Sequence, residues 1–141
     1  MKRILLITAT LFTTVTVSAA MAANYIEAEE LKQAFEKKAP MIIVDIQPAP
    51  DFVKQHLPGS IETNAFPAKT ADEKHRLDKV LTTVRASADP VIIVCPRGKS
   101  GAKNSYEYLL SQGVDENRLQ ILDDGIAGWP YKELFKQGNE N

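Results

Sequence analysis

The only cysteine of the chain, Cys95, lies where an apolar run meets a glycine-spaced loop. The stretch reads VIIVCPRGKSGA, and a helix is expected to begin shortly after the cysteine. Gly98 and Gly101 allow the backbone between strand and helix to turn its N–H groups inward without Cβ clashes. A joint of this kind directs several N–H groups, and the positive end of the helix dipole, at one point. The pattern therefore predicts an anion-binding loop with a thiol at its start.

The same loop carries two cations and a proline. Arg97 and Lys99 follow Cys95 closely, and cations beside a cysteine favour its thiolate form. Pro96 stiffens the start of the loop and removes one backbone donor. A purely structural buried cysteine would leave this basic loop unexplained. A nucleotide-binding P-loop is not supported, because position 93 is Ile where the spacing G-x-x-x-x-G-K-[ST] requires Gly.

Two reactions of a thiolate fit such a loop. Cysteine-dependent phosphate ester hydrolysis uses a Cys, five residues and an Arg, but the residue at that spacing is Gly101. The planar fork that holds a phosphoryl group is therefore missing. Sulfur transfer instead needs a thiolate that attacks a sulfane sulfur, becomes a persulfide and passes the outer sulfur on. The loop amides would stabilise the persulfide, and Arg97 and Lys99 would hold an anionic donor.

The rest of the chain predicts an α/β domain that positions this loop. Continuous apolar runs at 41–46, 90–95 and 118–122 predict buried strands, and 60–64 predicts a short one. Helical patterns precede Pro40 and cover 51–55, 100–113 and a stretch that begins with a capping box at 70–73 and continues to Val84. Residues 125–138 predict a turn and a last helix, with Pro130 suited to the first turn of that helix and Gly138 to its end. Alternation of strands and helices indicates a mostly parallel sheet with helices on both faces. Ligands bind beyond the carboxyl ends of such strands, where Cys95 and Asp45 are both expected.

The first 22 residues have the build of a secretory signal peptide. Lys2 and Arg3 precede an uncharged apolar stretch, and Ala20-Met21-Ala22 fits an A-x-A cleavage site. The apolar stretch is short for a membrane span, so we expect a periplasmic or secreted protein without stable membrane insertion.

Cleavage of this signal peptide reduces Lys+Arg from 17 to 15 against 18 Asp+Glu, so the net charge changes from −1 to −3. This acidic balance argues against nucleic-acid partners. An exported chain with a single cysteine has no internal disulfide.

Three segments together resemble the rhodanese family of sulfurtransferases, over residues 24–138 as one domain. They are VDIQPAPDFVKQHLPGSIETN, VIIVCPRGKSGA and the closing pair LLSQGV and DDGIAGW. The residues that carry the resemblance in the first and last segments are Asp45, Asp51, Phe52, His56, Pro58, Gly59, Gly113, Gly125 and Trp129. The resemblance implies a rhodanese-like three-layer fold with a central, mostly parallel five-stranded sheet and helices on both faces.

The resemblance also implies a thiosulfate sulfurtransferase activity with Cys95 as the persulfide carrier. The basic third residue of the six-residue loop, Arg97, and its hydroxylated sixth residue, Ser100, are similar to those of thiosulfate-using members. The implied substrate-binding residues are Pro96, Arg97, Gly98, Lys99, Ser100 and Gly101. The implied partners are a small anionic donor, thiosulfate or polysulfide, and a thiol or cyanide-like acceptor, which is either a small molecule or a protein. No metal and no cofactor are expected.

Four further residues are expected to support the site: Asp45, Asp51, His56 and Trp129. We interpret Asp45 as an acceptor of backbone N–H bonds in the turn that follows its strand, and His56 as a structural residue before Pro58-Gly59. Asp51 is expected either to receive hydrogen bonds from the loop or to cap its short helix, and Trp129 to lie in the core.

The chain departs from the family pattern at a few positions. Gln47 replaces the usual Arg, whose acidic neighbours include Asp45 and Asp51, while Ser60 and Asp124 replace small residues. Two other functions remain open from the sequence: a non-catalytic sulfur carrier or protein-binding module with the same fold, and a phosphatase or arsenate reductase.

Overall fold

The computed structural model describes residues 22–139, and these fold around a five-stranded parallel sheet with strand order β1-β5-β4-β2-β3. The strands are β1 (Tyr25–Ile26), β2 (Ile42–Asp45), β3 (Ser60–Glu62), β4 (Val91–Val94) and β5 (Leu119–Leu122). The three longer predicted strands are confirmed, and β2 and β4 are buried along their whole length. The two-residue β1 was not predicted, and it forms by pairing with β5 at the edge of the sheet.

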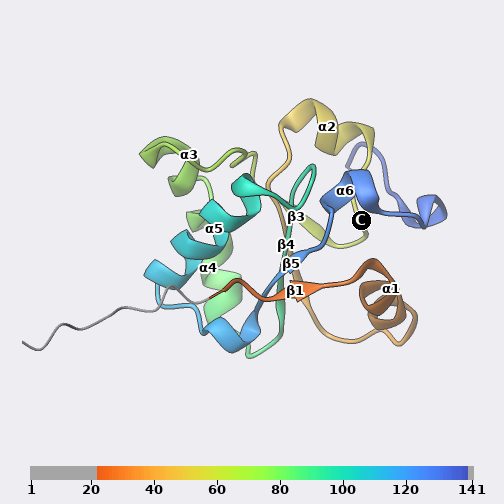
Figure 1. Ribbon diagram of the computed structural model, residues 1–141, viewed down its shortest axis with the longest axis horizontal. Helices are drawn as coiled ribbons and strands as arrows, with labels where there is room; N and C mark the ends of the chain where they lie inside the picture. The colour runs from red at the N-terminus through yellow and green to blue at the C-terminus, as the bar shows by residue number, and fades with distance from the viewer. Residues whose placement is uncertain (1–21, 140–141) are drawn as a thin grey trace, which may run out of the picture.

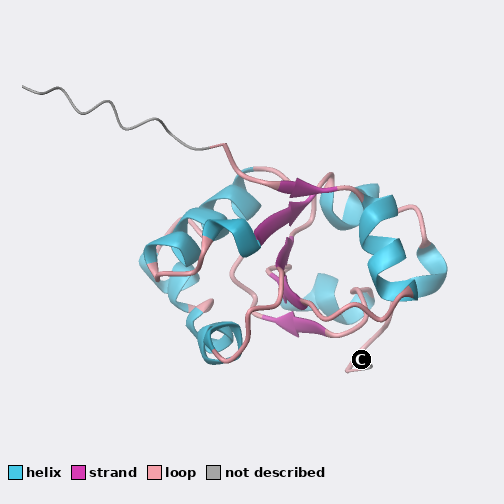
Figure 2. Ribbon diagram, turned by 90° about the horizontal axis from the view of Figure 1, so that it is seen from below, coloured by secondary structure: helices cyan, strands magenta, loops and turns pink. Residues whose placement is uncertain are grey.

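Helices cover both faces of the sheet (Figure 2). They are α1 (Ala28–Glu36), α2 (Ala49–Lys54), α3 (Ala71–His75), α4 (Asp78–Arg85), α5 (Ser100–Ser111) and α6 (Gly125–Gly128), with 3₁₀ turns at Glu116–Arg118 and Lys132–Leu134. One core joins α4 and α5 to the sheet, and a second core joins α1, α6 and Trp129 to the opposite face. The three-layer α/β fold expected from the sequence is therefore present. None of the described helices is long and apolar enough to cross a membrane.

Two predicted helices were wrong in extent. The helix that begins with the Thr70 capping box ends at His75, and a second helix starts at Asp78. Between them the backbone bonds join residues three apart, from Arg76 to Glu73 and from Leu77 to Lys74, and Leu77 is fully buried. Leu77 lies at this tight junction and packs in the same core as Val80, Leu81 and Val84.

The prediction of a turn and then a last helix that begins at Pro130 was also wrong, because the helix lies before Pro130 and only a 3₁₀ turn, Lys132–Leu134, follows it. The helix α6 ends at Gly128, and Trp129 is extended, with φ −69° and ψ 113°. A residue before proline is restricted to this region, and Pro130 therefore ends the helix instead of beginning one. Trp129 is fully buried in the second core, and this packing fixes the direction of the chain after α6.

The carboxyl ends of β2, β4 and β5 lie at one edge of the sheet. Figure 1 shows the loop between β4 and α5 at the same end of the molecule as α2 and α6. Because parallel strands β2 and β4 are in register, Asp45 lies beside Val94, one residue before the cysteine. The predicted leader, residues 1–22, falls outside the described residues except for its last position.

Candidate active site

The thiol of Cys95 lies at the base of the loop predicted to bind an anion. Its side chain is only 1% exposed, and the backbone N–H of Gly98 donates a hydrogen bond of 2.9 Å to its sulfur. Gly98 adopts φ +64°, which turns this amide toward the sulfur and which residues with a Cβ adopt at an energetic cost. The helix α5 begins at Ser100, so its positive end faces the same place. The arrangement can stabilise negative charge on sulfur.

Residues at the start of α6 hold the loop in place through backbone hydrogen bonds. Ile126 and Ala127 donate their backbone N–H groups to the carbonyls of Cys95 and Pro96, each at 3.0 Å. A Cβ on Gly125 would lie 2.2 Å from the Cys95 carbonyl oxygen, so only glycine permits this approach. The sequence marked Gly125 as a family residue but gave no sign of this contact, which joins segments about thirty residues apart.

A cavity of about 420 Å³ opens over the thiol. Its lining contains five of the six residues predicted to bind substrate, all but Gly98, whose amide contacts the sulfur instead. The full lining consists of Pro48, Asp51, Phe66, Cys95, Pro96, Arg97, Lys99, Ser100 and Gly101. The side chains of Arg97 and Lys99 are exposed, and within residues 22–139 they form no hydrogen bond or ion pair. Both cations are thus available to an anion.

Pro48 and Phe66 line the cavity but were not predicted from the sequence, and Phe66 lies against the loop itself. Its ring packs on the first turn of α5, where a Cβ on Gly101 would lie 2.8 Å and 2.9 Å from two ring carbons. Gly101 stands at the position where a cysteine phosphatase carries Arg, and the aromatic ring takes up the space beside it. No local pattern links Phe66 to Cys95, because the two meet only through the fold.

Asp45 supports the opposite wall of the cavity. Its carboxylate accepts hydrogen bonds from the backbone N–H of Gln47 at 2.8 Å and from Gln47 Nε2 at 3.0 Å, as expected for an acceptor in the turn. Gln47 Nε2 also donates to the carbonyl of Gln55 at 3.1 Å, so one side chain joins β2 to the end of α2. Burial raises the pKa of Asp45 from 3.8 to about 7, against a smaller downward effect of the Gln47 bonds. Asp45 does not line the cavity itself. Through Gln47 it instead helps to fix the end of α2, the helix that carries Asp51.

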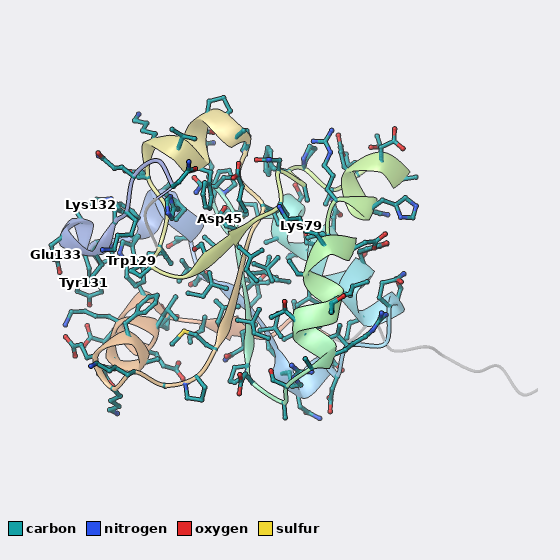
Figure 3. The ribbon with its side chains drawn as sticks, turned by 180° about the vertical axis from the view of Figure 1, so that it is seen from behind. Asp45, Lys79, Trp129, Tyr131, Lys132 and Glu133 are labelled. Carbon is teal, nitrogen blue, oxygen red and sulfur yellow. The ribbon has the colours of Figure 1, made fainter. Side chains whose placement is uncertain are left out.

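The two remaining predicted supporting residues lie away from the cavity lining. His56 is fully buried, stacks on Phe52 at 4.0 Å between ring centroids, and bonds through Nδ1 with the Phe52 carbonyl. Trp129 donates its Nε1–H to the Tyr131 carbonyl, and Figure 3 shows it beside residues 131–133 and apart from Asp45. Among the described residues, no group of three or more His, Cys, Asp or Glu side chains could hold a metal ion.

Comparisons with known proteins agree with this architecture. The profile of the Rhodanese-like domain matches residues 27–132. A protein tyrosine phosphatase of the Rhodanese family from yeast is similar in structure, with a TM-score of 0.62 and 14% identity over 85% of this chain and 96% of that one. A rhodanese-like domain protein from Staphylococcus aureus has a TM-score of 0.57 and 22% identity, over 81% of this chain and 97% of that one.

A thiosulfate sulfurtransferase from Pseudomonas aeruginosa is also similar, with a TM-score of 0.61 and 17% identity. The match covers 83% of this chain but only 20% of that protein. No curated protein matches the sequence. At these identities the solved structures establish a shared fold.

Proposed function

The chain belongs to the rhodanese-like domain family, and on this premise we propose that it is a sulfurtransferase that carries sulfane sulfur as a persulfide on Cys95. The donor is an anion such as thiosulfate or a polysulfide, and the acceptor is a thiol or a cyanide-like nucleophile. The observation that carries the proposal is the Gly98 amide bonded to the Cys95 sulfur beneath a cavity with two available cations.

The first half-reaction loads the sulfur. The Cys95 thiolate attacks the outer sulfur of thiosulfate, an S–S bond to Cys95 forms, the donor S–S bond breaks, and sulfite leaves with the electron pair. The Gly98 amide stabilises the negative sulfur throughout, since a preorganised donor needs no rearrangement. Arg97 and Lys99 bind the oxygens of the donor and of the departing sulfite.

The second half-reaction returns the enzyme to its starting state. A nucleophile such as cyanide attacks the outer sulfur of the persulfide and leaves as thiocyanate, and the electron pair returns to Cys95 as thiolate. Total charge is the same before and after each step, and neither step requires an external oxidant or reductant. The cavity of about 420 Å³ over the thiol has room for such a small acceptor.

Two features at position 101 support sulfur over phosphorus chemistry. Gly101 provides no guanidinium fork, and the ring of Phe66 lies within contact distance of any Cβ placed there. The similar yeast protein is described as a phosphatase, so hydrolysis of a generic aryl phosphate is the direct comparison assay. We expect no phosphatase activity above the level of a Cys95→Ser variant.

Intact-mass spectrometry tests the proposal. Incubation with thiosulfate or a polysulfide should add about 32 Da, one sulfur atom, in a form that cyanide removes. The Cys95→Ser variant should show no adduct while it stays folded, because Ser is nearly isosteric with the buried thiol. Absence of an adduct with every sulfane donor would overturn the proposal. A persulfide that neither cyanide nor any thiol discharges would instead indicate a non-catalytic carrier.

We also propose that the protein acts after export, in the periplasm or outside the cell, on the strength of the leader-like residues 1–22. Determination of the N-terminal residue of the exported protein tests this. A mature chain that begins at Ala23 supports export with cleavage, whereas a full-length chain in the cytoplasmic fraction contradicts it.

A further inference from the structure

A second cavity, of about 320 Å³, borders the Cys95 loop on the side of α6. Figure 1 shows α6 beside this loop, and backbone hydrogen bonds from Ile126 and Ala127 join the two. The cations of the loop, Arg97 and Lys99, line both this α6 cavity and the cavity over the thiol. The other residues that line the α6 cavity are Asp124, Ala127 and Gly128.

Asp124 has a backbone conformation that is less strained for glycine. Its φ is +55° and its ψ is 1°, in the left-handed region. The side chain does not cap α6, and within residues 22–139 it forms no hydrogen bond or ion pair. A residue held in a strained conformation, without a structural role for its side chain, indicates a role in binding.

The Asp124 carboxylate has a defined position in the α6 cavity. A Cβ on Gly128 would lie 2.4 Å from Asp124 Cβ and 3.7 Å from Asp124 Oδ2, so the acidic side chain lies over this glycine. Toward the loop, a Cβ on Gly98 would lie 2.8 Å from the backbone nitrogen of Asp124. Gly98 is the residue whose amide binds the Cys95 sulfur. Asp124 therefore packs directly against the loop that carries the thiol.

The α6 cavity presents charges of both signs that do not neutralise each other. Arg97, Lys99 and Asp124 are all exposed, and no ion pair in the described part of the chain joins the carboxylate to either cation. A simple anion satisfies only the cations and is repelled by Asp124. A ligand end with one ammonium group and one carboxylate places each of its charges beside an opposite charge. The lining therefore suits the zwitterionic end of an amino acid.

We infer that the α6 cavity binds the α-amino-acid end of a thiol peptide, the sulfur acceptor, and that Asp124 determines specificity for its ammonium group. This inference rests on the proposed function, because it names the acceptor class of the same site. Cys95 does not line the α6 cavity, so the charged end of the acceptor must be some distance from its thiol. A peptide provides this separation, whereas free cysteine has only a short link between its sulfur and its nitrogen.

The same two cations serve both half-reactions in turn. After sulfur loading, sulfite departs and leaves Arg97 and Lys99 to the carboxylate of the acceptor, whose ammonium group lies on Asp124. The acceptor thiol loses its proton to water, and its thiolate attacks the outer sulfur of the Cys95 persulfide. An S–S bond to the acceptor forms, the S–S bond to Cys95 breaks, and the electron pair returns to Cys95 as thiolate.

The probes are the thiol peptide γ-Glu-Cys-Gly and its glutaryl analogue, which lacks only the α-ammonium group and has an equally reactive thiol. Cys95 is loaded with sulfur from thiosulfate, the donor is removed, and intact mass gives the second-order rate constant for discharge of the persulfide. We expect the peptide to discharge the wild type about three to five times faster than the analogue, the upper range for one exposed ion pair. Asp124→Asn and Asp124→Gly should each reduce this ratio to about one, and so should about 1 M salt, which screens the pair.

Asp123→Asn is the matched control. It removes the same charge from the adjacent residue, but Asp123 does not line the α6 cavity. Its Oδ1 accepts the backbone N–H of Asp124 at 3.1 Å, and the Asn oxygen can accept the same bond, so this variant should keep the wild-type ratio. Both Asp124 variants should fold, because Asn and Gly adopt the left-handed backbone readily, and urea unfolding checks this.

The outcomes separate this inference from the proposed function. A ratio near one in the wild type, or an unchanged ratio in both Asp124 variants, overturns the inference while discharge by cyanide still supports sulfur transfer. An equal fall of the ratio in Asp123→Asn overturns it as well, because the effect then comes from the general field of the surface. Discharge by cyanide but by neither peptide also overturns it. Failure of every sulfane donor to load Cys95 overturns the proposed function itself.

Discussion

Asp45 makes the stability of this protein depend on pH in a direction opposite to that of most carboxylates. Its side chain is fully buried, and its hydrogen bonds come from the uncharged Gln47. These hydrogen bonds and the charge of His56 lower the pKa of Asp45, but by less than burial raises it. Burial therefore dominates and raises the pKa of Asp45 from 3.8 to about 7.

The sign and size of the effect follow from proton linkage. The folded protein keeps the Asp45 proton up to about pH 7, whereas the unfolded chain loses it near its ordinary pKa of 3.8. The raised pKa thus adds stability that is complete below pH 3.8 and is lost as the pH rises through about 7. The whole effect is about 4 kcal/mol, and the part lost between pH 5 and pH 8 is about 3 kcal/mol.

Urea unfolding at pH 5 and pH 8 of the wild type and Asp45→Asn measures this quantity. The variant cannot titrate at position 45, so the difference between the two proteins should change by about 3 kcal/mol in favour of Asp45→Asn as the pH rises. Glu107→Gln, at an exposed position on α5, is the control and should follow the wild type at both values. A difference that stays constant, or that moves in favour of the wild type, would refute the claim that Asp45 is buried with its proton.

Three further predictions concern the loop, its cation and a helix cap. Gly98→Ala should destabilise the fold by about 2 kcal/mol or more in urea unfolding and abolish persulfide formation, because φ is +64° and the new Cβ would lie 2.8 Å from the backbone nitrogen of Asp124. Arg97→Ala should raise the KM for an anionic donor about tenfold and change kcat much less, and an equal fall in kcat would show that Arg97 acts in the transition state instead. Thr70→Ala should lower stability by about 1 kcal/mol, since Thr70 accepts the Glu73 amide at 3.2 Å, and an unchanged urea midpoint would contradict this.

The sequence predicted the parts of the fold that depend on local pattern. Continuous apolar runs located β2, β4 and β5, and the capping box at Thr70 is present with both of its hydrogen bonds. Gly113 ends α5 with φ +85°, as its position after the helical pattern indicated. These features are set within a few residues of one another, so the sequence alone contains the physical cause.

The features that the sequence did not predict depend on distant contacts. Strand β1 has two residues, too few for a periodic signal, and it exists because β5 offers an open edge. Phe66 reaches the cavity because its segment is bonded to Ile46 and Asn104, from two other parts of the chain. Pro130 fits the first turn of a helix as well as the end of one, and the burial of Trp129 decides between the two.

Neutral residues at positions 47 and 101 limit the positive charge around the site. Gln47 holds α2 without adding a charge at the strand end where the family pattern has Arg. Gly101 has no side chain, so the ring of Phe66 packs against the position where a phosphatase carries Arg. Of the residues that line the cavity, only Arg97 and Lys99 then carry positive charge, and both are exposed on the loop. Binding of an anionic donor therefore depends on these two side chains together with the loop amides, such as that of Gly98.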